Sequence, residues 1–97
     1  MPDAVHELLA TEAALTKLGA RNVSADEAGQ VPRNGHVIVR NPRSGGEQDR
    51  RRLIVGSTDG GRVLTLVIER TIDPTTWLIV TGWSATDVER NLLERER

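Results

Sequence analysis

Arginine side chains are concentrated in the middle of this 97-residue sequence. Residues 33–62 contain seven Arg against three acidic residues (net +4), residues 1–32 two basic against five acidic (−3), and residues 63–97 four against six (−2). A guanidinium group binds phosphate or carboxylate bidentately, so the basic segment is a candidate site for RNA or an acidic partner. Charge runs of this kind also occur in solvated loops. The candidate RNA-binding residues are Arg43, Arg50, Arg51 and Arg52.

Few side chains in the sequence can transfer protons. Cys is absent and His6 and His36 are its two histidines, so we expect no thiolate nucleophile, no metal site and no cofactor. Nucleophile elbows, phosphate-binding loops and dinucleotide fingerprints are also absent. Metal-free cleavage of a phosphodiester remains, in which a base deprotonates a ribose 2′-OH, Arg stabilises the charged phosphate and an acid protonates the leaving oxygen. His36, His6 and Glu89 are the candidates for proton transfer, although a lone His is often structural.

Length and composition favour a single domain that spans residues 1–97. Hydrophobic residues make up 37% and charged residues 28% of the chain, a balance typical of a globular protein. The sequence contains no apolar stretch long enough to span a membrane, and its first residues do not resemble a signal peptide. We therefore expect a cytoplasmic protein.

Helix signals occur near both ends of the sequence. Asp3 as an N-cap, leucines at helical spacing and Gly19 predict an amphipathic helix over residues 4–18. Ser24 with Glu27 three residues later forms a capping box and predicts a second helix over residues 25–31. A third helix should begin after Thr86, which forms a capping box with Glu89, and its charged end at residues 94–97 should fray.

The middle of the sequence has the character of β-strands. Strands are predicted over residues 36–40, 52–58, 62–69 and 77–83, with a flexible basic loop over residues 41–51. Asp59-Gly60-Gly61 between two apolar runs is a strong hairpin signal. The expected fold is α+β: two N-terminal helices covering one face of a four-stranded, mainly antiparallel sheet, a short C-terminal helix, and a second sheet face left partly open.

Two tryptophans occur on the last predicted strand. Because side chains alternate along a strand, Trp77 and Trp83 should point to the same face, opposite Leu78 and Val80. If Leu78 and Val80 face the helices, both indoles lie on the open face, where they could stack on bases or anchor a protein partner. The alternative is that one or both belong to the core, since the chain has no Phe or Tyr.

Several segments of the sequence resemble one toxin family. They are Leu53-Ile-Val-Gly-Ser-Thr58, Gly61-Arg62-Val-Leu64, Val80-Thr81, Ala85-Thr86 and Glu89-Arg90, with looser similarity at Lys17-Leu18-Gly19, Val23-Ser24 and Glu27-Ala28. Together they are similar to BrnT-type toxins, small ribonucleases of the RelE-like superfamily that are encoded beside an antitoxin. The segment 53–90 carries the most specific part of this resemblance.

The resemblance implies a type II toxin that cleaves RNA without a metal and inhibits translation. Its implied catalytic residues are Arg62, Arg90, Thr81 and Glu89, to which His36 is added from the residue chemistry above. The implied partners are a cognate antitoxin, such as a ribbon-helix-helix protein, and RNA or the ribosome, with a dimer or a hetero-oligomer with the antitoxin as assembly. The alternative is a non-catalytic RelE-like domain that binds a protein through its open sheet face, with Trp77 and Trp83 as partner-binding residues. A nucleic-acid-binding regulator is a third alternative.

Overall fold

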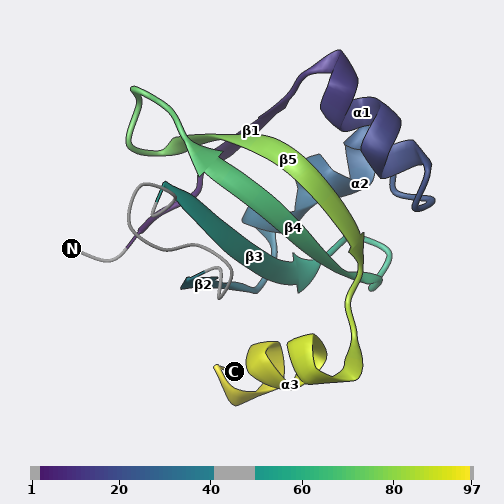
Figure 1. The fold of residues 1–97 in the computed structure, drawn as a ribbon. Helices are drawn as coiled ribbons and strands as arrows, with labels where there is room; N and C mark the ends of the chain where they lie inside the picture. The colour runs from purple at the N-terminus through teal and green to yellow at the C-terminus, as the bar shows by residue number, and fades with distance from the viewer. Residues whose placement is uncertain (1–2, 41–49, 97) are drawn as a thin grey trace.

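A five-stranded sheet organises the computed structural model, which describes residues 3–40 and 50–96 (Figure 1). Its strands are β1 (Glu7–Ala10), β2 (His36–Arg40), β3 (Arg51–Ser57), β4 (Val63–Arg70) and β5 (Thr76–Ser84), in the order β1-β5-β4-β3-β2. The pair β1–β5 is parallel and the other pairs are antiparallel. The helices are α1 (Glu12–Gly19), α2 (Ala25–Gln30), the short 3-10 turn η1 (Val31–Arg33) and α3 (Asp87–Arg95). The α+β class is confirmed, but the sheet is mixed and has five strands instead of four.

The additional strand lies inside the segment predicted as the first helix. Residues 7–10 form β1, which pairs with β5, and the helix begins only after Thr11, whose hydroxyl accepts a hydrogen bond from the Ala14 amide at 3.2 Å. Local helical periodicity was overridden here because β5 offers free backbone groups to a strand almost 70 residues distant in sequence. Asp3 is therefore not a helix cap, and the residue with a left-handed backbone after α1 is Asn22, not Gly19.

The main core lies between the sheet and the helices α1 and α2. Leu18, Ala28 and Val31 are fully buried against apolar strand residues on this face, which we call the covered face. The strand residues that form it are Ile54, Leu64, Leu66, Ile68, Trp77 and Ile79. On the other face, Leu93 of α3 packs with Val37 and Val55 of β2 and β3. Because α3 packs mainly on these two strands, β4, β5 and β1 are less covered on this face, which we call the half-open face.

A β-bulge in β5 changes which side chains share a face. Val67 pairs with Thr81, but the next β4 residue, Ile68, pairs with Ile79, so Val80 has no partner in the ladder. The extra residue reverses the alternation of side chains on either side of it. Trp77 therefore lies on the covered face, whereas Trp83, opposite Thr65, lies on the half-open face.

The remaining predicted elements agree closely with the structure. Both capping boxes form, Ser24 with Glu27 at α2 and Thr86 with Glu89 at α3. The Asp59-Gly60-Gly61 turn joins β3 to β4, and Gly61 adopts a φ of 89° that favours glycine. The α3 helix extends to Arg95, with Leu93 buried in its last turn, and the fraying of residues 94–97 stays a prediction. The predicted loop falls largely on residues 41–49, outside the described residues.

Candidate functional site

The carboxylate of Glu89 accepts hydrogen bonds from three different elements at the end of β5. Its Oε1 accepts from the Thr65 hydroxyl of β4 at 2.9 Å, from the Trp83 indole N–H of β5 at 3.0 Å, and from the Thr86 amide at the α3 N-terminus at 2.8 Å. The capping box places Glu89 in the first turn of α3, and the connection 85–86 brings this turn against the half-open face.

These contacts set the ionisation of Glu89. Burial raises the pKa of its carboxyl, but the Thr86 amide and the Trp83 and Thr65 donors stabilise the charged form more strongly, so the net pKa is lowered. The positive end of the α3 backbone dipole favours the same charged form. Glu89 is therefore a carboxylate at neutral pH.

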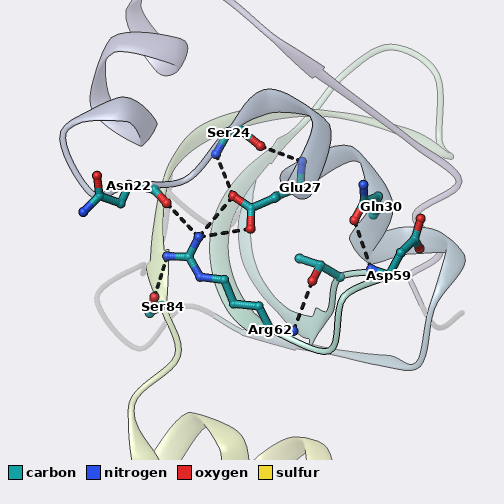
Figure 2. Close-up of polar contacts among 8 residues, drawn as sticks. Asn22, Ser24, Glu27, Gln30, Asp59, Arg62 and Ser84 are labelled. Atoms are coloured by element: carbon teal, nitrogen blue, oxygen red, sulfur yellow. Dashed lines mark hydrogen bonds and ion pairs between the residues drawn. The ribbon is translucent and has the colours of Figure 1, made fainter.

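Arg62 lies at the same strand end, on the side of the sheet that carries α1 and α2. Its Nη1 donates to the Asn22 carbonyl at 2.7 Å and to both Glu27 carboxylate oxygens at 3.1 Å, and its Nη2 donates to the Ser84 hydroxyl at 2.7 Å (Figure 2). The guanidinium thereby joins the turn before β4 to the α1–α2 connection and to β5. The pKa of Glu27 is lowered by the Ser24 amide and then by Arg62.

Trp83 lies between Glu89, to which its indole donates a hydrogen bond, and Ser84, which binds Arg62. It is half-buried, and the guanidinium carbon of Arg21 lies 5.8 Å from its ring centroid, within the range of a cation–π contact. Ser84, the next residue, bonds Arg62 on the opposite side of the strand. Thr81 lies two residues before Trp83, half-buried on the same half-open face. The structure thus gathers Glu89, Thr81 and Trp83 on one face, with Arg62 behind the strand end.

Two predicted catalytic residues are not brought into this cluster. His36 begins β2 opposite Gly56, on the covered face, and its Nδ1 lies 2.9 Å from the Asn34 carbonyl oxygen. Arg90 is exposed on α3, and its side chain makes no hydrogen bond or ion pair within the described ranges 3–40 and 50–96. His6, the other histidine considered, is exposed just before β1.

The arginines predicted to bind RNA do not share one surface. Arg52 is 9% exposed and its Nε donates to Asp3 Oδ2 at 2.8 Å, whereas Arg51 points to the other face and pairs with Glu69 at 3.2 Å. This separation follows from the alternation of neighbouring strand residues. Arg50 is exposed just before β3, and Arg43 lies outside the described residues.

Trp77 belongs to the core, which was the alternative to the predicted partner-binding position on the open face. It is 1% exposed in the main core, its indole N–H donates to the Ala4 carbonyl at 3.0 Å, and Arg70 lies 4.9 Å from its ring centroid. The β-bulge at Val80 is the reason for this correction. Of the two indoles, Trp83 alone is accessible to a partner on the half-open face.

Several residues of the cluster were not singled out from the sequence. Thr65 resembles an ordinary strand residue, and Ser84 and Asn22 are 22 and 40 residues from Arg62, so no local pattern connects them. Glu27 was identified as a helix cap and as part of a family-like motif, but not as a partner of Arg62. The one available signal for Thr65 was strand alternation, which places it on the face opposite to that of its neighbours Leu64 and Leu66.

No group of three His, Asp or Glu side chains that could hold a metal ion occurs within residues 3–40 and 50–96. None of the helices in the described part of the chain is long and apolar enough to span a bilayer.

Neither the family models, nor the curated proteins, nor the solved structures give a significant match to the chain. No relative therefore indicates what the chain does, and its function has to be inferred from the residues of the cluster and from the sequence motifs.

Proposed function

We propose that this protein is the toxin component of a type II toxin–antitoxin pair, a metal-independent endoribonuclease that inhibits translation. The observation that carries the proposal is the ionised Glu89 carboxylate beside the half-exposed Trp83, with Arg62 and Arg21 around the same strand end. The more specific motifs that resemble BrnT-type toxins lie on β4, β5 and α3, which supply residues of this cluster, and on the neighbouring strand β3.

In this proposal Glu89 accepts the proton of a ribose 2′-OH, the 2′-oxygen attacks the phosphorus to form a cyclic phosphate, and the bond to the 5′-oxygen breaks, with water protonating that leaving oxygen. An ionised carboxylate is the form a general base needs, and the described hydrogen bonds all end on Oε1, which leaves Oε2 to take the proton. The exposed Arg90 would bind the phosphate and Thr81 would line the substrate path on the half-open face. Arg62 lies behind the strand end and would bind the phosphate only on release from Asn22, Glu27 and Ser84. The proposed partner is an antitoxin that covers this face.

The test is RNA cleavage by the purified protein in the presence of EDTA, together with growth on induction in bacteria. Glu89→Gln should abolish both activities and keep the fold, because Gln also completes a capping box. Asp87→Asn is the matched control: it removes a negative charge from the same first turn of α3 without touching the cluster. Loss of cleavage in both variants, or in neither, would contradict the role of Glu89.

A second candidate function is favoured by the engagement of Arg62. Four hydrogen bonds hold its guanidinium to Asn22, Glu27 and Ser84. This arrangement indicates a structural role, in which Arg62 holds separate segments of the fold together. The half-open face also exposes apolar side chains, such as Leu9 at 45%. A non-catalytic domain that binds a protein through this face is consistent with both observations. If the wild-type protein neither cleaves RNA nor slows growth, this second function replaces the first.

A further inference from the structure

Thr65 is a fully buried hydroxyl residue in the middle of the sheet. It lies on β4, is 0% exposed, and points to the half-open face opposite Trp83. Its Oγ1 donates to Glu89 Oε1 at 2.9 Å, a contact that spans 24 residues of sequence. A buried hydroxyl needs a hydrogen-bond partner, and here that partner is the carboxylate of a residue at a helix N-terminus.

The three hydrogen-bond donors to Glu89 belong to three different parts of the fold. Thr65 donates from β4, the Trp83 indole from β5, and the Thr86 amide from the start of α3. All three bonds end on Oε1, and none of the hydrogen bonds among the described residues ends on Oε2. Hydrogen bonds to a charged acceptor are short and strong, so they restrict both the rotamer and the plane of the carboxylate.

We infer that Thr65 and Trp83 are positioning residues that hold Glu89 through Oε1 and present its Oε2 to a bound ligand. The catalytic consequence rests on the proposed function, whereas the hold on the carboxylate does not. A capping box alone needs only the helix's own backbone, so the two donors from the sheet are additional to what α3 requires. They fix the carboxylate relative to the strands and not only to its helix.

The charged side chains next to Glu89 on α3 are those of Asp87 and Arg90. Arg21 lies over the Trp83 ring, and Asp87 shares the first turn of α3 with Glu89. Removal of the Thr65 hydroxyl therefore leaves the neighbouring charges unchanged and takes away one donor to the charged form. The pKa of Glu89 should then rise toward its ordinary value, because burial still opposes ionisation.

The experiment follows the Glu89 carboxyl by NMR titration in the purified protein and its variants. Thr65→Val and Trp83→Phe should each raise the Glu89 pKa, and Thr65→Ser, which keeps the hydroxyl, should restore the wild-type value. Thr58→Val is the matched control: Thr58 is also buried, but its hydroxyl accepts from the Arg62 amide, so the Glu89 pKa should not change. An unchanged Glu89 pKa in Thr65→Val would overturn the inference.

Kinetics then test the catalytic consequence separately. Thr65→Val should lower kcat for RNA cleavage by roughly tenfold with little change in KM, since general-base catalysis contributes about 10²–10⁴-fold and a misplaced base loses part of it. The acid limb of the pH–rate profile should move to higher pH, and Thr65→Ser should reverse both effects. A variant that raises KM alone would contradict a positioning role. If wild type cleaves no RNA, the proposed function fails, while the NMR titration still decides whether Thr65 holds Glu89.

Discussion

Trp77 and Trp83, six residues apart on β5, lie on opposite faces of the sheet because the bulge at Val80 separates them. Trp77 is buried in the main core and bonded to the Ala4 carbonyl, and Trp83 is half-buried and bonded to Glu89. One strand therefore supplies a structural indole to one face and an accessible indole to the other.

This arrangement predicts different behaviour for the two indoles. Trp77→Ala should cost roughly 3–5 kcal/mol of unfolding free energy because it leaves a cavity in the core, and Trp83→Ala should cost less. The variant Trp77→Phe retains only Trp83, and the variant Trp83→Phe retains only Trp77. Acrylamide should quench the tryptophan fluorescence of Trp77→Phe much more strongly than that of Trp83→Phe. Equal quenching of the two would contradict their assignment to different faces.

A second prediction concerns Asp3, which joins the N-terminal segment to the sheet. Its Oδ1 accepts from Arg70 at 2.7 Å and its Oδ2 from Arg52 at 2.8 Å. Burial raises the Asp3 pKa, but these two arginines outweigh that effect and lower it below the unfolded value of about 3.9. The stabilisation is therefore complete above about pH 4 and is lost as the pH falls through the folded pKa.

Denaturant unfolding of Asp3→Asn against wild type checks this sign. The variant should be less stable at pH 7, and the difference between the two proteins should shrink as the pH falls below about 4. A difference that stays constant with pH would show that the Asp3 charge does not matter. Asp59→Asn, which affects an exposed pair with Arg33, is a suitable control.

The parts of the fold that depend on local sequence could be predicted. Both capping boxes and the Asp59-Gly60-Gly61 turn are set by residues within five positions of one another, so their spacing is visible in the sequence. β1 could not be predicted, because its strand state depends on pairing with residues 76–79 and its apolar spacing also fits a helix. The bulge was equally hidden, since nothing in residues 77–83 marks Val80 as unpaired.

The candidate site was predictable only in part for the same reason. Glu89 and Trp83 were selected from the sequence, but their mutual hydrogen bond and the third partner, Thr65, arise from packing of α3 on the sheet. Arg51 and Arg52 are adjacent in sequence and therefore looked like one basic patch, whereas strand alternation separates them. The number of charged residues in a segment does not show which face of the sheet each side chain occupies.

A third prediction contrasts two glycines. A Cβ at Gly82 would lie 2.5 Å from Leu66 Cδ2 and 3.1 Å from Leu18 Cδ2, in the packed region beneath α1. Gly82→Ala should therefore lower the unfolding free energy by about 1–3 kcal/mol through overpacking. Gly29 in α2 has open space around a Cβ, so Gly29→Ala should raise stability by about 0.5–1 kcal/mol. Thermal unfolding of both variants tests the opposite signs, and a stable Gly82→Ala would contradict the close packing of β5.

The last prediction separates the two roles open to Arg62. In its structural role, it joins the turn before β4 to the α1–α2 connection and to Ser84, so Arg62→Ala should lower Tm by roughly 4–8 °C, the shift expected for the loss of about 1 kcal/mol in a domain of this size. Arg62→Lys keeps the charge but cannot reach Asn22, Glu27 and Ser84 together, so it should also be destabilised. Ser84→Ala removes one of the same contacts and leaves the guanidinium in place, which makes it the control for stability alone.

If Arg62 also binds the phosphate, both Arg62 variants should lose RNA cleavage well below their melting temperatures, where they remain folded, while Ser84→Ala should keep it. Cleavage that falls only in proportion to the unfolded fraction would assign Arg62 to the fold and not to the reaction.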